Sequence, residues 1–488
     1  MSSPAGSEAA PTNHNPAETA ALEAARARAD SYVEELAEFV RIPSVSTDAQ
    51  HVPDMSAAAQ WLAQRVRRAG VPDVQIMPTE GHPVVVGRWH AAPGAPTVII
   101  YGHYDVQPPE PLELWQSPPF EPEIRDGKLY GRGASDDKAG VLTAVYAVEA
   151  AAAATGAPPI NVTFLFEGEE EVGSPNLVPF IRQHKDLFAA DLAISADGGI
   201  FGVGVPSLTV GSRGLTGVEV KVTGANADLH SGMYGGAVAN PIMALSHIIS
   251  SLQGEDGVVK VAGFYDGIPE LSADERSAIG AVPQVEGELE GLGLREWWGD
   301  AAFTPEERRV VRPTLEVNGM WGGYQGAGIK TVLPSQAFAK ITCRLVRGQD
   351  PADVATKVAR HIENAAPDGV TVEVRQLPGN GRAYQMPLDL DVLRLAGQAM
   401  ERTFGRRPFP VWTGGTVPVA EQFVSELGVW CLYFAFGEPD NGLHAPNEFY
   451  RLKTLHQGVE ATVRLFFGLA ADPGAVQRPE EQSAGGAR

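Results

Sequence analysis

Apolar runs rich in β-branched residues recur in the first two hundred residues, and each ends in polar side chains. The runs are TVIIYGHYDV at 97–106, NVTFLFEGEEEVGS at 161–174 and DLAISADGG at 191–199. Continuous runs of this kind suit strands that are covered on both faces. A helical pattern at 137–154 separates the first two runs. This β–α–β alternation predicts an α/β fold, in which helices flank a mostly parallel sheet.

Two further helices are predicted before the first strand, at 18–40 and 55–70, from the spacing of their apolar residues. The pattern changes near residue 212, where strands with alternating faces and separate helices predict an α+β unit. Its middle, at about 263–312, is acidic and less regular. After about 386 the α/β pattern returns, with a helix near 389–404 and the apolar strand VWCLYFAF at 429–436.

These changes divide the chain into a larger domain and an insertion. The larger domain takes residues 19–211 and 386–472, and the inserted α+β domain takes residues 212–385. The ends, 1–18 and 473–488, are rich in Ala, Pro, Ser, Gly and Glu and are predicted to be disordered tails. The N-terminal end lacks the basic and apolar regions of a signal peptide. No uninterrupted apolar run is long enough to span a membrane.

Charge and cysteine content limit the partners and the compartment. The net charge of −22 argues against binding to nucleic acid or to anionic membranes, because phosphates are bound by an excess of Lys and Arg. Cys343 and Cys431 both lie in apolar stretches, which favours buried free thiols in a reducing compartment. We therefore expect a cytoplasmic protein.

Candidate chemistry follows the predicted strands. His103 and Asp105 share one side of a strand end, so both side chains could meet one metal ion, or Asp105 could orient His103 from behind. Asp136 and Asp137 precede a helix, where either could simply cap it. The remaining strand-end candidates are Glu167, Glu169, Glu170, Glu171 and Asp197, together with His444 in a later loop.

Each cluster taken alone has an ordinary structural explanation, such as a solvated strand end or a helix cap. Together, two His and several carboxylates follow the strands of a single predicted sheet, whose carboxyl ends share one edge. This mixture of ligands suits zinc, manganese or cobalt. One carboxylate that bridges two ions would hold them about 3.5–4 Å apart, as in two-metal hydrolases.

Five segments carry a resemblance to a known family. GHYDVQP, GRGASDDKAG, EGEEEVGS, DLHSGMYGG and GLHAPNEF occur in the order found in dinuclear zinc metallopeptidases. That family includes cytosolic non-specific dipeptidase, carnosinase, aminoacylase and succinyl-diaminopimelate desuccinylase. The resemblance covers about residues 30–470 and is strongest to the dipeptidase branch, through DLHSGMYGG and IKTVLPSQA. It implies that the larger domain is catalytic and that the insertion is a lid and dimerisation domain.

The resemblance also implies roles for individual residues. His103 and Asp197 would bind one ion, Glu171 and His444 the other, and Asp136 would bridge the two, with a cis peptide between Asp136 and Asp137. A water between the ions would attack the substrate, with Glu170 as the general base and Asp105 orienting His103. DDKAG differs from the family pattern, since an alanine precedes the usual glycine.

The inserted domain would complete the substrate site. By resemblance, His230 would reach the active site of the partner subunit and stabilise the oxyanion, and Arg344 would pair with the terminal carboxylate of the substrate. Thr331 and the GGT at 414–416 would add polar contacts. Pro378 stands where the dipeptidase branch has a histidine, which bears on substrate preference.

The sequence thus leads us to expect a cytoplasmic, homodimeric metallo-dipeptidase that holds two divalent ions, zinc before manganese or cobalt, and hydrolyses short peptides. Two alternatives remain. An N-acyl-amino-acid deacylase would use the same scaffold, because it also cleaves an amide next to a carboxylate. A metal-storing or peptide-binding protein without catalysis would be expected to lack Glu170 or a ligand, and every one of these positions is filled.

Overall fold

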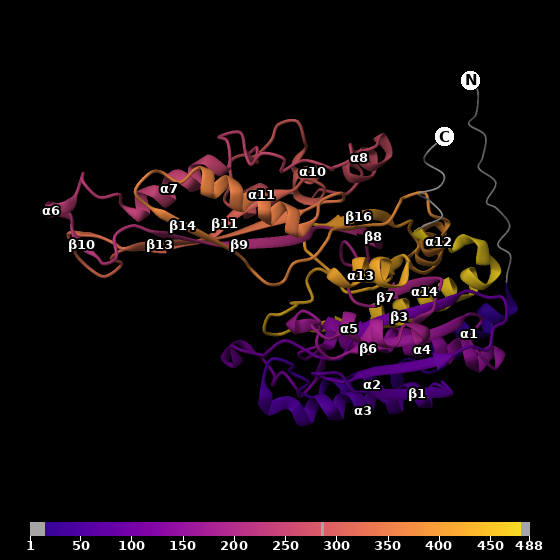
Figure 1. The fold of residues 1–488 in the computed structure, drawn as a ribbon. Helices are drawn as coiled ribbons and strands as arrows, with labels where there is room; N and C mark the ends of the chain where they lie inside the picture. The colour runs from indigo at the N-terminus through magenta and orange to yellow at the C-terminus, as the bar shows by residue number, and fades with distance from the viewer. Residues whose placement is uncertain (1–14, 285–286, 480–488) are drawn as a thin grey trace, which may run out of the picture. The chain divides into compact units, whose positions relative to one another are not determined.

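The structure is a computed structural model that describes residues 15–284 and 287–479. It divides into two compact units (Figure 1). The first unit takes Met1–Pro206, Leu390–Pro408 and Glu426–Arg488, and the second takes Ser207–Asp389 and Phe409–Ser425. Within the described residues, no helix combines the length and the apolar character needed to cross a lipid bilayer.

A six-stranded sheet forms the centre of the first unit. Its order is β1-β2-β6-β3-β7-β17. The last four strands are parallel, and they are β6 (Asn161–Glu167), β3 (Thr97–His103), β7 (Leu192–Ser195) and β17 (Cys431–Tyr433). β1 (Asp73–Met77) and β2 (Val84–Trp89) extend the sheet in antiparallel fashion. The α/β class predicted from the sequence is confirmed, and the antiparallel edge is an addition to it.

Helices cover this sheet and explain why its strands are apolar on both sides. α4 (Ala139–Thr155) packs against β3, and α1 (Pro16–Ala27) and α14 (Leu452–Ala471) pack against α4. α3 (Val52–Arg68) packs against β1 and β2. Arg65 of α3 is fully buried and donates to Glu35 and Glu149, at 2.6 and 2.8 Å, which ties α3 to α2 (Ala29–Val40) and α4.

The start of the chain corrects two sequence expectations. The single helix predicted at 18–40 is two helices, α1 and α2, because Arg28 between them leaves the helical conformation (φ −108°, ψ 5°). The tail predicted at 1–18 also ends earlier, since Asn15 caps α1 and buried Glu18 accepts hydrogen bonds from Arg402 and Arg464. Residues 1–14 of that tail lie outside the described residues.

The tail predicted at 473–488 is likewise shorter. Pro473–Ala475 forms a turn of 3₁₀ helix with Ala475 buried, and Arg478 donates to the carbonyl of Ala190 and to Asp191, both at 3.1 Å. These contacts fix the chain beyond residue 473. Residues 480–488 lie outside the described part.

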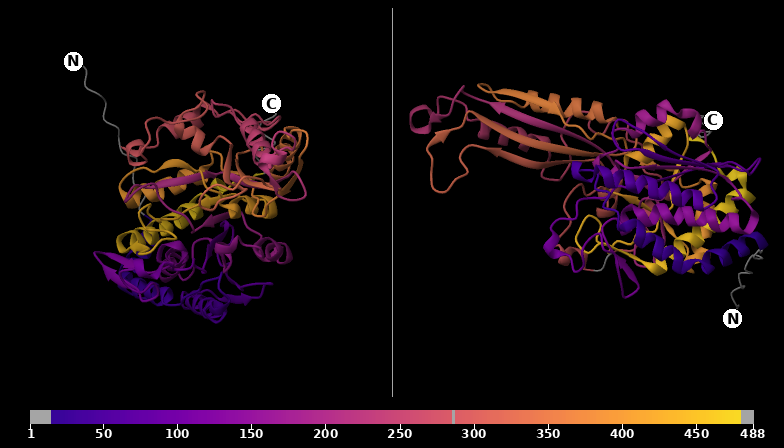
Figure 2. Two further views of the ribbon diagram at one scale, coloured as in Figure 1. Left: turned by 90° about the vertical axis from the view of Figure 1, so that its left-hand side faces the viewer. Right: turned by 90° about the horizontal axis from the view of Figure 1, so that it is seen from below.

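The second unit is built on a four-stranded antiparallel sheet. Its order is β11-β13-β9-β14, with β11 (Thr314–Gly322), β13 (Gln336–Leu345), β9 (Gly214–Thr223) and β14 (Thr371–Gln376). α7 (Pro241–Leu252) and α11 (Pro351–Asn364) pack on this sheet and on each other, and their apolar faces form the core of the unit with it (Figures 1 and 2). In its described residues, the less regular stretch at 263–312 contains three short helices, α8 (Ala273–Gly280), α9 (Glu288–Gly291) and α10 (Pro305–Val310).

A small three-stranded sheet sets where the second unit begins and ends. β8 (Ser207–Ser212) pairs with β16 (Phe409–Thr413) and with β15 (Tyr384–Gln385). Because of this pairing, the second unit includes residues 207–211, 386–389 and 409–425. The boundaries drawn from the sequence, after 211 and 385, assign these residues to the larger domain instead. The GGT at 414–416 is therefore part of the second unit.

Candidate metal centre

The candidate ligands of the first unit come from the carboxyl ends of its parallel strands. His103 is the last residue of β3, and Asp197 follows the end of β7 by two residues. Glu170 and Glu171 lie in the 3₁₀ turn Glu170–Val172 after β6, and His444 lies in the loop after β17. Because these strands are parallel, the residues beyond their ends gather at one edge of the sheet.

Asp105 orients His103 and also fixes the turn that carries the glutamates. The Nδ1 atom of His103 lies 3.1 Å from the carbonyl oxygen of Asp105 and 3.3 Å from its Oδ1. The same carboxylate accepts hydrogen bonds from the backbone N–H groups of Glu170 and Glu171, at 3.3 and 3.1 Å. Of the two roles open from the sequence, the geometry favours an Asp105 that supports the ring of His103 through Nδ1, so that Nε2 faces Asp136, where a cation could bind.

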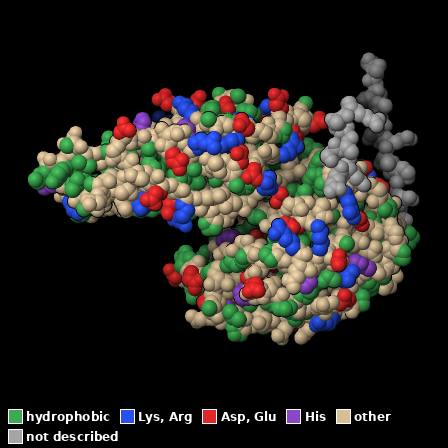
Figure 3. Space-filling model, in the orientation of Figure 1, with side chains coloured by type: hydrophobic (Ala, Val, Ile, Leu, Met, Phe, Trp, Pro, Cys, Tyr) green, Lys and Arg blue, Asp and Glu red, His purple; other side chains and the backbone are tan. Residues whose placement is uncertain are grey.

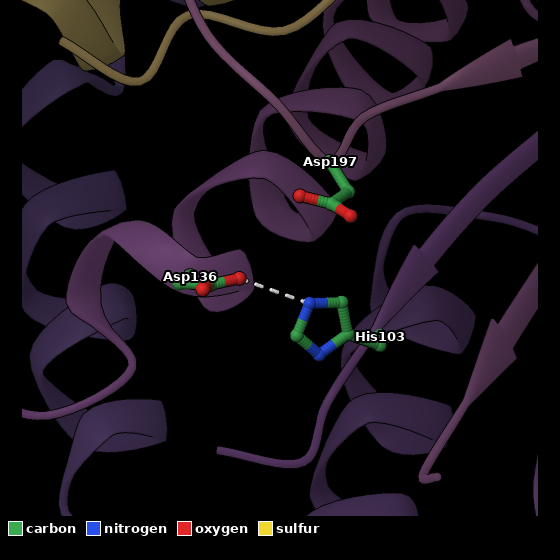
Figure 4. Close-up of side chains that lie close together, drawn as sticks. All are labelled: His103, Asp136 and Asp197. Carbon is green, nitrogen blue, oxygen red and sulfur yellow. Dashed lines mark hydrogen bonds and ion pairs between the residues drawn. The ribbon is translucent and has the colours of Figure 1, made fainter. Parts of the chain in front are cut away.

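Asp136 stands between two groups of ligand atoms. Its Oδ1 is 3.0 Å from Nε2 of His103, and its Oδ2 is 2.9 Å from Nε2 of His444. One group is His103, Asp136 and Asp197, drawn in Figure 4, and the other is Asp136, Glu171 and His444. Within each group the ligand atoms lie within 4.8 Å of one another. The structure thus brings all five sequence-derived ligands together, with Asp136 common to both groups and a cis peptide between Asp136 and Asp137.

The electrostatics of the site fit two cations. Burial and the charge of Asp136 raise the pKa of Asp197 to about 7 and that of Glu171 to about 8. Oε1 of Glu171 is buried and has no hydrogen-bond partner among the described residues. Carboxylates so closely packed repel one another unless protons or cations neutralise them. The donors are imidazoles and carboxylates, which are the ligands of zinc, manganese and cobalt hydrolases.

The four glutamates of the run at 167–171 have different partners and different surroundings in the structure. Glu167 accepts from Tyr101 and Ser174, at 2.6 and 2.8 Å, and Glu169 accepts from Asn176 at 2.8 Å. Glu170 belongs to neither ligand group, and burial together with the charges of Asp136 and Asp105 raises its pKa. A carboxylate that is not committed to a cation and favours protonation can take up and release a proton.

Gln107 and Asp137 contact two of the candidate ligands, and the sequence did not assign this role to either residue. Gln107 donates to Oε2 of Glu171 at 2.7 Å. Asp137 is buried, and its Oδ2 accepts from the backbone N–H of His103 at 3.3 Å, so this second Asp supports the ligand strand. His103, Asp105 and Gln107 are spaced two residues apart, and this spacing is the sequence signal that could have identified Gln107.

In the second unit, Arg344 lies at the end of β13 next to the GGT. Its Nη1 donates to Oγ1 of Thr416 at 2.7 Å, and in the described parts of the chain no carboxylate pairs with it. Arg213, which was not among the residues predicted from the sequence, donates to the carbonyls of Gly414 and Gly415 at 2.9 and 3.0 Å. Burial and the charge of Arg344 lower the pKa of Arg213 to about 10. Two neighbouring guanidinium groups favour an anion here.

His230 and Thr331 lie together at a different place in the second unit. β10 (Leu229–His230) pairs with β12 (Val332–Leu333), and the backbone N–H of Ser231 donates to the carbonyl of Thr331 at 3.1 Å. Both side chains are exposed. The N–H of Gly232 donates to Nδ1 of His230 at 3.0 Å, which leaves Nε2 as the protonated nitrogen of the neutral ring. His230 can therefore donate a hydrogen bond to an anion.

A helix-flanked sheet with two ligand groups that share one carboxylate is the arrangement of two-metal hydrolases. Comparison with known families gives the same class. The family model described as peptidase family M20/M25/M40 matches residues 99–467. The chain belongs to this family, and it is a hydrolytic enzyme.

Several relatives cover nearly the whole chain. It is 30% identical to a Cys-Gly metallodipeptidase (dug1) of Schizosaccharomyces pombe, over 88% of this chain and 94% of that protein. It is also 30% identical to the human Beta-Ala-His dipeptidase, over 90% of each. Among solved structures, the M20 family metallo-carboxypeptidase Sso-CP2 of Sulfolobus solfataricus matches with a TM-score of 0.78 and 31% identity, over 90% of this chain and 99% of that one.

The shared position of Asp136 generates a prediction about metal content. Asp136→Asn replaces a carboxylate with a neutral amide that cannot bridge two cations through two oxygens. We expect the wild-type protein to retain about two zinc ions per chain after dialysis, and the variant to retain fewer than about one. Elemental analysis of the dialysed proteins measures this. Asp186→Asn, at an exposed position, serves as the control, and two tightly held ions in the Asp136 variant would contradict the bridging role.

Proposed function

We propose that this enzyme is a dinuclear metallo-dipeptidase that hydrolyses dipeptides or other short peptides. The observation that carries the proposal is Asp136, whose two oxygens face both groups of ligand atoms. The names of the relatives, a Cys-Gly metallodipeptidase and a Beta-Ala-His dipeptidase, support the substrate class. Zinc is the proposed metal. The buried thiols of Cys343 and Cys431 favour a reducing, cytoplasmic setting.

In this proposal the residues of the first unit hold the cations and move one proton. His103 and Asp197 would hold one cation, Glu171 and His444 the other, and Asp136 both. Two bound divalent cations would supply Lewis-acid chemistry, which polarises a carbonyl and lowers the pKa of water. Glu170 accepts the proton of the attacking water and returns it to the leaving amine, because its own carboxylate is not a ligand. Asp105 keeps both His103 and the Glu170 turn in place.

Arg344 is proposed to bind the terminal carboxylate of the substrate. Its guanidinium is half-buried, has the hydroxyl of Thr416 as its polar contact, and lies beside the charge of Arg213. A carboxylate would complete a two-pronged hydrogen bond with Arg344. An enzyme with such a contact cleaves next to a free carboxyl terminus.

We also propose a homodimer in which His230 and Thr331 complete the substrate site of the partner subunit. Within one chain, His230 and Thr331 lie near the Gln336 end of β13 and Arg344 lies near the other end, roughly 27 Å away at about 3.4 Å per residue. Exposed apolar side chains lie close to His230 and Thr331 in the chain, including Met233 at 74% and Ile329 at 94% exposure. Figure 3 shows hydrophobic side chains gathered where α6 (Ser231–Tyr234) and β10 lie.

A substrate panel tests the proposed reaction. We expect unblocked dipeptides to turn over faster than N-acetyl amino acids and faster than tripeptides, and C-terminal amidation to slow cleavage by at least about tenfold, through loss of the Arg344 contact. Initial rates of the zinc-loaded enzyme on matched sequences measure this. Faster turnover of the acetylated set would favour the N-acyl-amino-acid deacylase. Equal cleavage of longer peptides would favour a carboxypeptidase, the activity named for the Sulfolobus relative.

The role of Glu170 gives a second prediction. Glu170→Gln keeps the shape of the side chain but cannot accept a proton, so we expect kcat to fall by about 10²–10⁴-fold while the zinc content stays at the wild-type level. Steady-state kinetics together with elemental analysis measure both. Glu169→Gln, in the neighbouring position, is the control. Wild-type kcat in the Glu170 variant would refute the assignment.

A shared site in the dimer gives a third prediction. His230→Ala and Glu170→Gln should each abolish most activity when present in both subunits. In a heterodimer of the two variants, one site combines the intact Glu170 of one chain with the intact His230 of the other. We expect about half of the wild-type turnover per dimer from differently tagged, co-expressed chains. Turnover no higher than that of the parent variants would show that His230 does not act across subunits.

A further inference from the structure

We propose that Glu448 is a positioning residue that holds Asp136 in place against His444, and thereby sets the affinity of the site for its cations. This inference rests on the proposed function, since it concerns the carboxylate assigned there as the bridge. Glu448 lies four residues after His444 and was not singled out from the sequence. It belongs to neither group of ligand atoms.

The carboxylate of Glu448 is fully buried and is surrounded by donors from a single loop. Its Oε2 accepts from Nη1 of Arg132 at 2.7 Å and from the backbone N–H of Gly133 at 2.9 Å. Its Oε1 accepts from the backbone N–H groups of Ser135 and Asp136, at 2.8 and 3.1 Å. One side chain thus holds the loop 132–136 up to the backbone of Asp136 itself.

The same contacts connect the Asp136 loop to the segment that carries His444. The N–H of Gly131 donates to the carbonyl of Glu448 at 2.9 Å, and β18 (Phe449–Arg451) continues this pairing with β5 (Lys128–Tyr130). Asn441, on the other side of His444, donates to Oγ of Ser135 at 2.7 Å. His444 and Asp136, which face each other at 2.9 Å, therefore project from two loops that are joined on both sides of His444.

The chemistry of the four donors explains why residue 448 is a glutamate. All four partners donate, so only a side chain with two acceptor oxygens satisfies them. A glutamine would turn an NH₂ group toward two of these donors, and the unpaired groups would push the loop away from it. A ligand that lacks its supporting hydrogen bonds typically binds its metal 10–100-fold more weakly.

Glu438 offers a matched control in the same loop. It is 3% exposed and is also surrounded by donors, since Oε1 accepts from the N–H of Gly204 at 3.0 Å and Oε2 from Nη1 of Arg451 at 2.5 Å. In the described structure its side chain makes no hydrogen bond with the loop 132–136. Glu438→Gln therefore causes the same chemical change at the same depth without releasing Asp136.

The experiment compares zinc affinity in the wild type, Glu448→Gln and Glu438→Gln by competition with a chromophoric chelator. Circular dichroism first shows that each full-length protein is folded. We expect Glu448→Gln to weaken zinc binding by at least about tenfold, and Glu438→Gln by less than about threefold. If Glu448→Gln does not fold, Glu448→Asp replaces it. Aspartate keeps the charge but is one methylene too short to reach both pairs of donors, so the same loss is expected.

Two results would overturn the proposal. Wild-type zinc affinity in a folded Glu448 variant would show that the contacts do not position Asp136. An equal loss in the Glu438 variant would show that any buried glutamate of the loop has this effect. The failure of the proposed function is a separate outcome, because it would appear in the wild type as the absence of tight zinc binding or of peptide hydrolysis.

Discussion

Buried carboxylates of like charge repel one another, and this repulsion is the constraint on which the whole site depends. Asp136, Asp197, Glu170 and Glu171 lie at one edge of a sheet, where burial raises the pKa of Asp197 to about 7 and of Glu171 to about 8. Such a cluster is stable when cations neutralise it. The two imidazoles beside it, from His103 and His444, complete the two groups of candidate ligand atoms.

The fold meets this constraint by holding the ligands rigidly from behind. Asp105 contacts the ring of His103 and the backbone of the Glu170 turn, so one carboxylate sets the positions of a ligand and of the proposed base. In our proposal, Glu448 positions Asp136 in the same way. The general principle is that ligands from distant segments need supporting contacts to meet within a few ångströms.

Much of this arrangement could be predicted from the sequence, for identifiable reasons. The parallel strands could be predicted because each is a continuous apolar run, and His103, Glu171, Asp197 and His444 because each lies at or beyond the end of such a run. Asp136 instead precedes a helix, and only the family resemblance gave it the bridging role. β1 was missed because its segment, DVQIM, mixes apolar and polar residues, whereas β2 opens with three valines that could have predicted it. Glu448 was missed because a buried supporting residue has no periodic pattern. The division of the chain into units also depends on the pairing of β8 with β16, two segments about 200 residues apart, which local patterns do not reveal.

The second unit carries two further groups of candidate substrate-binding residues. Arg344 and Arg213 form a cationic site, and His230 and Thr331 lie at an exposed position elsewhere in the unit. The central claim, however, concerns Asp136. Anomalous diffraction at the zinc edge, from crystals of the zinc-loaded protein, tests it most directly. Our account expects two peaks about 3.5–4 Å apart, with one oxygen of Asp136 coordinated to each. A single peak, or two peaks of which only one contacts Asp136, would contradict it.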